Sequence, residues 1–142
     1  MKRFLAVLLI LFLFSTFPAF AVEELIYRTD DVELHLPASW SERILILPTP
    51  TGATFYQKDS YDRYLEDGLP GGGFLFSLGA SVNRSFEELE QYIYLGFSYK
   101  SAMHYYMQLP SDYPAFMDDE IRQEWDAMFA SVRGIAQGAV IE

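Results

Sequence analysis

The first 21 residues differ in composition from the rest of this chain. If they are removed after synthesis, only the remaining residues form the folded protein. Lys2 and Arg3 precede an unbroken apolar run from Phe4 to Phe14, and Ala19-Phe20-Ala21 has the small-residue pattern of a cleavage site. This order is typical of a secretory signal peptide. The apolar run covers 11 residues, whereas a membrane-spanning helix needs about 20. We therefore expect cleavage after Ala21 and a soluble exported chain, periplasmic or extracellular; a retained N-terminal anchor is the alternative.

Composition narrows the classes of partner that residues 22–142 can bind. The leader holds two of the ten basic residues and none of the twenty acidic ones, so eight basic residues face twenty acidic ones and the net charge is −12. Such a surface repels nucleic acid and anionic lipid, which are bound through Lys and Arg patches. We therefore expect no nucleic-acid partner and no stable membrane insertion after cleavage.

The chain contains no cysteine, which excludes disulfides, thiol nucleophiles and thiolate metal sites. Stability must therefore come from burial of apolar side chains. A chain of roughly 120 residues can bury enough surface for one unaided core. We expect a single globular domain over residues 22–142.

Short apolar stretches predict strands through most of this domain. Val32–Leu36 alternates apolar and polar residues, as a strand with one buried face does. Arg43–Leu47 and Ala53–Gln57 flank a segment with two prolines and a glycine, which favour a turn, so these runs predict a hairpin. The further predicted strands are Phe74–Leu78, Tyr92–Ser98 and Ala102–Leu109. The polar stretch Lys58–Pro70 is expected to be a loop with a helical turn near Tyr61–Leu65.

Two segments carry helix signals. Ser85-Phe86-Glu87-Glu88 fits a capping box and predicts a short helix over residues 85–91. Asp118-Asp119-Glu120 places negative charge where a helix N-terminus favours it, and an apolar stripe at helical spacing follows. The predicted helix spans residues 118–133, with Gly134 as its left-handed C-cap.

Hairpin-connected strands followed by one long helix predict an α+β domain. We expect a mostly antiparallel sheet of five or six strands, with the C-terminal helix packed on one face. The helix stripe consists of Ile121, Trp125, Met128 and Val132, and the expected sheet face of Phe74, Phe76 and Leu78.

Three segments resemble small exported bacterial proteins of unassigned function. Pro37-Ala38-Ser39-Trp40 gives their P-x-x-W step, Gly52–Lys58 the next strand, and Gly72–Ser77 their G-G-x-L-F-S strand; Tyr105–Asp112 is similar to a later strand end of the group. More loosely, the P-x-x-W start resembles PsbP-like domains, whose antiparallel sheet is flanked by helices. Many of these proteins carry a lipobox cysteine, which this chain lacks. The resemblance implies a fold and little chemistry, because a fold alone does not fix function.

Catalytic and cofactor motifs are missing from the sequence. The glycines 71–73 precede a strand and no lysine follows, unlike a phosphate loop, and the metal motif H-E-x-x-H and the nucleophile elbow G-x-S-x-G are absent. His35 and His104 lie on the polar sides of predicted strands. If those strands were neighbours, the imidazoles could meet, and Glu33 or Asp112 could complete a metal site or proton relay. A hydrolase-type or metal-dependent enzyme using both histidines is therefore the alternative, but two solvated histidines are the simpler interpretation, and we expect no cofactor and no metal.

Aromatic residues supply the candidate binding surface. Trp40 follows a strand and most simply fills one end of the core. Strand alternation places several tyrosines outside the main core, where exposed rings suit protein or carbohydrate contacts; a second packed layer under a loop or helix is the alternative. The candidate binding residues are Trp40, Tyr56, Tyr61, Tyr64, Tyr92, Tyr94 and Tyr106. We expect a non-catalytic binding or accessory domain at the cell envelope, with an envelope protein or a glycan as partner.

Overall fold

The computed structural model describes residues 24–112 and 118–142, so the expected leader lies outside the described residues. The strands are β1 (Leu25–Arg28), β2 (Val32–Leu36), β3 (Ile44–Thr49), β4 (Gly52–Gln57), β5 (Phe74–Ser81), β6 (Tyr92–Ser98), β7 (Met103–Gln108) and β8 (Val140–Ile141). The helices are α2 (Lys58–Glu66), α3 (Asp119–Ala130) and α4 (Val132–Gln137), with short 3₁₀ turns η1 (Ala38–Trp40) and η2 (Ser85–Glu88).

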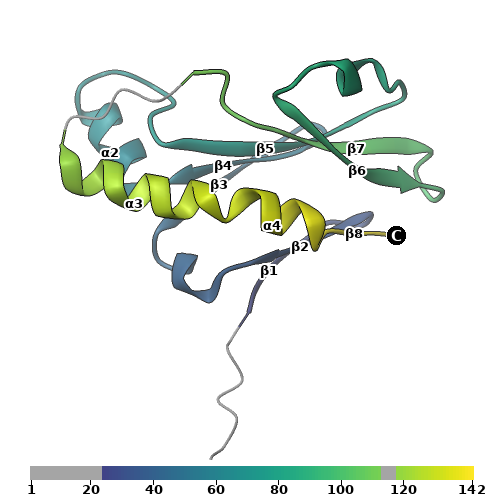
Figure 1. Cartoon of the computed structure of the whole chain (residues 1–142), viewed down its shortest axis with the longest axis horizontal. Helices are drawn as coiled ribbons and strands as arrows, with labels where there is room; N and C mark the ends of the chain where they lie inside the picture. The colour runs from purple at the N-terminus through teal and green to yellow at the C-terminus, as the bar shows by residue number, and fades with distance from the viewer. Residues whose placement is uncertain (1–23, 113–117) are drawn as a thin grey trace, which may run out of the picture.

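The strands form two antiparallel sheets. The larger has the order β3-β4-β5-β7-β6 and the smaller the order β1-β2-β8. Figure 1 shows α3 and α4 running along one face of the larger sheet, with the smaller sheet on that same side. The expected α+β class, with mostly antiparallel strands and a C-terminal helix, is confirmed. The strands outnumber the five or six expected because β1 and β8 have only four and two residues, too few to show a period.

The core lies between the larger sheet and the layer formed by the smaller sheet and the helix. The rings of Phe55 and Phe76 stack with centroids 4.3 Å apart, and Tyr27 from the smaller sheet meets Phe55 edge-on at 5.1 Å. Trp125 is only 2% exposed, and its indole Nε1 donates to the Phe74 carbonyl oxygen at 3.1 Å. The C-terminal helix is therefore docked on the sheet as expected.

A β-bulge at the start of β5 changes the expected sheet face. Phe55 pairs with Phe76 but the next residue, Tyr56, pairs with Phe74, which leaves Leu75 unpaired and fully buried. The Phe74 ring accordingly contacts Tyr56, at 5.9 Å, on the face opposite Phe76. The expectation that Phe74 shares a face with Phe76 is therefore wrong. A bulge inserts one residue and shifts the alternation of side chains between the two faces. A continuous apolar run gives no sequence signal for such a bulge.

The segment after β4, which was expected to be a loop with a helical turn near Tyr61–Leu65, forms the nine-residue helix α2. Its N-cap is Gln57, which is fully buried; its Oε1 accepts from the Ser60 N–H at 3.1 Å, and its Nε2 donates to Glu124 of α3. Glutamine is not among the residues preferred at this position. The helix start is thus supported by a contact with α3, which lies 67 residues away in the sequence.

The other helix ends also differ from expectation. Residues 85–88 form a 3₁₀ turn whose cap is Arg84, without a side-chain cap, so the capping box at Ser85 is not formed. Asp118 does cap α3, with its Oδ1 accepting from the Ile121 N–H at 2.8 Å. Helix α3 ends with Ser131 as its C-cap, and a second helix, α4, follows directly. Gly134 therefore lies inside a helix rather than at its C-cap.

Candidate functional site

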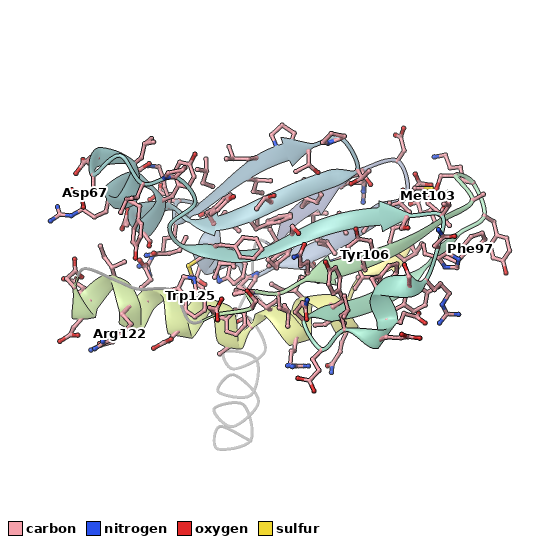
Figure 2. All side chains as sticks on the ribbon, turned by 90° about the horizontal axis from the view of Figure 1, so that it is seen from above. Asp67, Phe97, Met103, Tyr106, Arg122 and Trp125 are labelled. Carbon is pink, nitrogen blue, oxygen red and sulfur yellow. The ribbon has the colours of Figure 1, made fainter. Side chains whose placement is uncertain are left out.

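Three of the candidate tyrosines pack together on the face of the larger sheet opposite the core. Tyr92, Tyr94 and Tyr106 lie beneath Phe86 of η2, and we call these four residues the Phe86 cluster; Figure 2 shows Tyr106 from above. Ring centroids are 4.2 Å apart for Phe86–Tyr106 and 5.3 Å for Tyr92–Tyr106. Burial, with a smaller contribution from Tyr92, raises the pKa of Tyr106. The cluster therefore has the character of a second packed layer.

A glycine makes this layer possible. A Cβ atom on Gly79 of β5 would lie 2.8 Å from Cζ of Tyr106, so the ring occupies the space that any larger residue would need. Arg84, which directly precedes η2, has its guanidinium 4.6 Å from the centre of the Tyr94 ring. The backbone at Gly79 and the side chain of Arg84 therefore both contact the tyrosine rings.

The remaining aromatic candidates separate into packed and open positions. Trp40 is buried and belongs to the core. The ring centroids of Tyr61 of α2 and Tyr56 are 5.0 Å apart. Burial, and to a smaller extent the electrostatic interaction with Tyr61, raises the pKa of Tyr56. Tyr64, one turn further along α2, lines a groove. It is the candidate whose position best suits an incoming ligand.

The Tyr64 groove has a volume of about 490 Å³ and lies between the α2–β5 connection and the end of β7. Its walls include Tyr64, Leu69, Phe74, Leu109, Pro110 and Asp112. A Cβ on Gly72 would lie 2.3 Å from Cγ of Tyr64, so the ring rests directly on that backbone. Leu69 is held by its own N–H, which donates to the Tyr64 carbonyl at 2.8 Å, yet its side chain is 55% exposed.

The exposed aliphatic residue of this groove, Leu69, was not predicted from the sequence. Leu69 is 55% exposed and lines the groove, whereas Leu65 is equally exposed but is not part of the lining. Leu69 lies beyond the end of α2 at Glu66, so its sequence signal is only that it is an apolar residue in a mostly polar segment.

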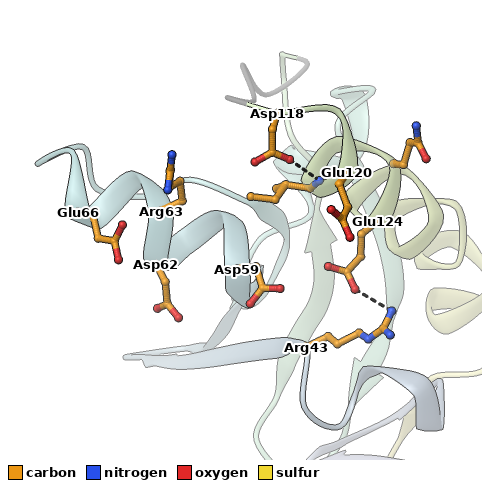
Figure 3. Close-up of a pocket in the computed structure, with 10 residues that line it drawn as sticks. Arg43, Asp59, Asp62, Arg63, Glu66, Asp118, Glu120 and Glu124 are labelled. Carbon is orange, nitrogen blue, oxygen red and sulfur yellow. Dashed lines mark hydrogen bonds and ion pairs between the residues drawn. The ribbon is translucent and has the colours of Figure 1, made fainter.

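A second concave surface, the acidic cleft, separates α2 from the start of α3 (Figure 3) and has a volume of about 840 Å³. Its charged lining consists of Asp59, Asp62, Glu66, Asp118, Glu120, Glu124, Arg43 and Arg63. Arg43 pairs with Glu124 at 2.7 Å, and Lys58 outside the lining pairs with Asp62. Six carboxylates facing two guanidinium groups give this surface a negative potential that attracts cations.

The two histidines lie on different sheets and contact different residues. On β2, His35 has Nδ1 2.9 Å from a Glu24 oxygen and Nε2 2.9 Å from a Glu33 oxygen. The hydrogen bond to Glu24 and the two negative charges raise the pKa of His35. On β7, His104 has Nδ1 3.1 Å from the Tyr94 hydroxyl. The expected carboxylate Glu33 is therefore present beside His35, but the structure does not bring the two imidazoles together.

The other carboxylate considered, Asp112, accepts a hydrogen bond from its neighbour Ser111. Across residues 24–112 and 118–142, no group of three or more His, Asp or Glu side chains is arranged to hold a metal ion. The same residues contain no helix with the length and hydropathy needed to cross a membrane.

Comparison with known proteins adds no relative: the chain matches no protein-family model, and no curated protein or solved structure is significantly similar to it. What the fold and the two concave surfaces define is an antiparallel α+β domain with an apolar groove and an acidic cleft on either side of α2. The resemblance to exported bacterial proteins and PsbP-like domains stays a prediction from motifs.

Proposed function

We propose that residues 22–142 are an exported, non-catalytic domain that binds a protein partner at the cell envelope through the Tyr64 groove. The observation that supports this most is the exposure of Leu69 beside an aromatic-walled groove. Exposed apolar side chains gathered at a concave surface are typical of interaction sites, because covering them removes apolar area from water. The leader supports the export step.

The groove suits a protein segment better than a glycan. Saccharides stack on flat, uncovered aromatic faces, whereas one face of the Tyr64 ring rests on Gly72 and the other walls include Leu69, Leu109 and Pro110. Asp112 at the groove and the net charge of −12 on residues 22–142 disfavour an acidic partner. The partner segment should carry an apolar side chain within a neutral or basic stretch.

The groove is tested by quantitative capture from envelope extracts with the purified domain as bait. Leu69→Asp should reduce capture of the specific partner at least tenfold, because a charge replaces the exposed apolar contact. Val82→Asp is the matched control, since Val82 is 69% exposed in the β5–η2 connection away from the groove. Equal capture by both variants would contradict the proposal, and elution by free saccharides would identify a glycan instead.

The enzyme alternative has a separate test. A His35→Ala/His104→Ala double variant that remains folded should keep its partner binding, because neither histidine lines the groove. Loss of the cellular function in that folded variant would favour the histidine-dependent enzyme.

Export is tested by mass spectrometry of the protein recovered from cell fractions. We expect a mature chain that begins Val22-Glu23-Glu24. An intact leader recovered in the membrane fraction would show that this segment is an anchor.

A further inference from the structure

The two sheets have four edge strands, and three of them are protected against pairing with another chain. Proteins protect edges with short strands, charges and bulges, because unpaired backbone N–H and C=O groups invite a further strand. β6 has a register break between Tyr94 and Gly96, and Ile141 packs on Gly96. β1 has four residues and carries the Arg28–Glu33 ion pair at its end. β8 has two residues.

The fourth edge, β3, has six residues, and its first four carry no charge and no bulge. Ile44, Leu45, Ile46 and Leu47 are uncharged and half-buried. Among the strands described here, no neighbour pairs with the outer side of β3. Pro48 and the exposed residue Thr49 end the strand, so the available edge is short but apolar.

The register shows which backbone groups face outward from β3. The Lys58 N–H donates to the Arg43 carbonyl at 2.7 Å, and the Gln57 N–H points the other way, to Gly73 of the β5 side, at 2.8 Å. Because hydrogen-bonding directions alternate along an antiparallel strand, the N–H and C=O groups of Ile44 and Ile46 point away from β4. Pro48 falls at the next outward position, where its missing N–H costs no bond within the sheet.

The acidic cleft lies at the beginning of this edge. Arg43, the residue directly before β3, is part of the cleft lining, which carries six carboxylates (Figure 3). A strand added along β3 would therefore end beside this lining, in which carboxylates outnumber guanidinium groups although Arg43 itself is paired with Glu124. Long-range attraction of this kind favours a partner with basic residues there.

We propose that the β3 edge binds an extended segment of a partner protein as a sixth strand, with alternating apolar side chains and basic residues at the end nearest the acidic cleft. Main-chain hydrogen bonds to Ile44 and Ile46 supply affinity, as in other strand additions. Apolar side chains at alternate positions contact Leu45 and Leu47. This rests on the proposed function only in that the partner is a protein, and it uses a surface other than the Tyr64 groove. A second copy of the chain is disfavoured because each copy carries a net charge of −12 over residues 22–142.

The first experiment uses two synthetic peptides of alternating Val and Thr. One carries two lysines at its N-terminus and the other carries two lysines at its C-terminus. Binding to the isotope-labelled mature domain should shift the Ile44 and Ile46 amide signals and slow their hydrogen exchange at least tenfold at saturation. The same peptide with N-methyl groups on the residues that face β3 should bind at least tenfold more weakly. Shifts confined to other residues, or equal binding of the N-methylated peptide, would overturn the proposal.

Two variants separate the parts of the proposal. Leu45→Lys places a charge on the edge and should abolish peptide binding, while Val82→Lys, its exposed control, should not. Asp59→Asn/Glu66→Gln should weaken the lysine peptides several-fold and leave a lysine-free peptide unchanged; equal effects on both peptides would contradict the role of the acidic cleft.

The outcome is distinguishable from that of the proposed function. If the peptides fail to bind while Leu69→Asp still abolishes partner capture, strand addition is wrong and the groove stands. If sedimentation shows a dimer that Leu45→Lys dissociates, the edge is occupied by a second copy, which also overturns the proposal.

Discussion

The two ends of the larger sheet treat their outward-facing aromatic side chains differently. At the β6–β7 end, Phe86 packs on the half-buried rings of Tyr92, Tyr94 and Tyr106 in the Phe86 cluster. At the α2 end, Tyr64 and the exposed Leu69 line an open groove. The same residue type therefore serves packing in one place and forms an accessible wall in the other. What decides between them is whether another segment of the chain covers the ring, which composition does not reveal.

The largest expected effect on stability comes from removing Trp125, which docks α3 on β5 near the α2 end of the sheet. Trp125→Ala should lower the free energy of unfolding by about 3–5 kcal/mol, the usual cost of removing a buried Trp. Its indole is buried, stacks on Phe129 at 4.7 Å and bonds the Phe74 carbonyl. Against a total of roughly 5–15 kcal/mol, the chemical denaturation midpoint should fall sharply. An unchanged midpoint would show that α3 does not dock on β5.

The next effect compares the two ends directly. Phe86→Ala should cost about 3 kcal/mol, at the lower end for a core Phe, because it uncovers three tyrosines. Leu69→Ala at the groove should change stability by no more than about 0.5 kcal/mol, as exposed positions do. Both are measured by denaturant unfolding with tyrosine near-ultraviolet dichroism. Equal costs at the two positions would remove the distinction between a packed cluster and an open groove.

Most of the fold follows from local sequence patterns, and the exceptions have identifiable causes. The hairpins Ile44–Gln57 and Tyr92–Gln108 and the docked helix α3 were predictable because alternation, turn residues and helical spacing act within a few residues. The bulge at Leu75 and the cap at Gln57 depend on partners far along the chain. Strands of two to four residues carry no measurable period.

The candidate site was only partly predictable for the same reason. Alternation correctly placed Tyr92, Tyr94 and Tyr106 off the core face, but it could not indicate that Phe86 covers them. The exposure of Leu69 and the open edge of β3 depend on what is missing around them in three dimensions. Sequence patterns report which residues alternate, and they do not report which surfaces are left uncovered.

A pair of glycines sharpens the comparison at intermediate size. Gly79→Ala should cost about 1–3 kcal/mol, as overpacking does, because the new Cβ forces the Tyr106 ring against Phe86. Gly134→Ala in α4 meets no atom within 4 Å and should stabilise the protein by up to about 1 kcal/mol through helix propensity. Denaturant midpoints of the two variants check this. A neutral Gly79→Ala would mean that the Phe86 cluster is loosely packed.

The smallest expected effect lies outside both ends, at His35 on the smaller sheet. Because Glu24 and Glu33 raise the pKa of His35, the stabilisation is fully present below its unfolded value of about 6.5 and is lost as the pH rises through the higher folded value. Glu33, whose pKa Arg28 chiefly lowers, acts in the acidic range instead, where its stabilisation is lost as the pH falls. In low salt, where exposed ion pairs are least screened, the wild type should lose stability between pH 6 and 8.5 (a window set about the ordinary His value) and His35→Gln should lose less. The difference between the two proteins cancels the α-amino group, which titrates in the same range. A proton NMR titration midpoint of His35 at or below the ordinary value would contradict the ion pairs seen around it.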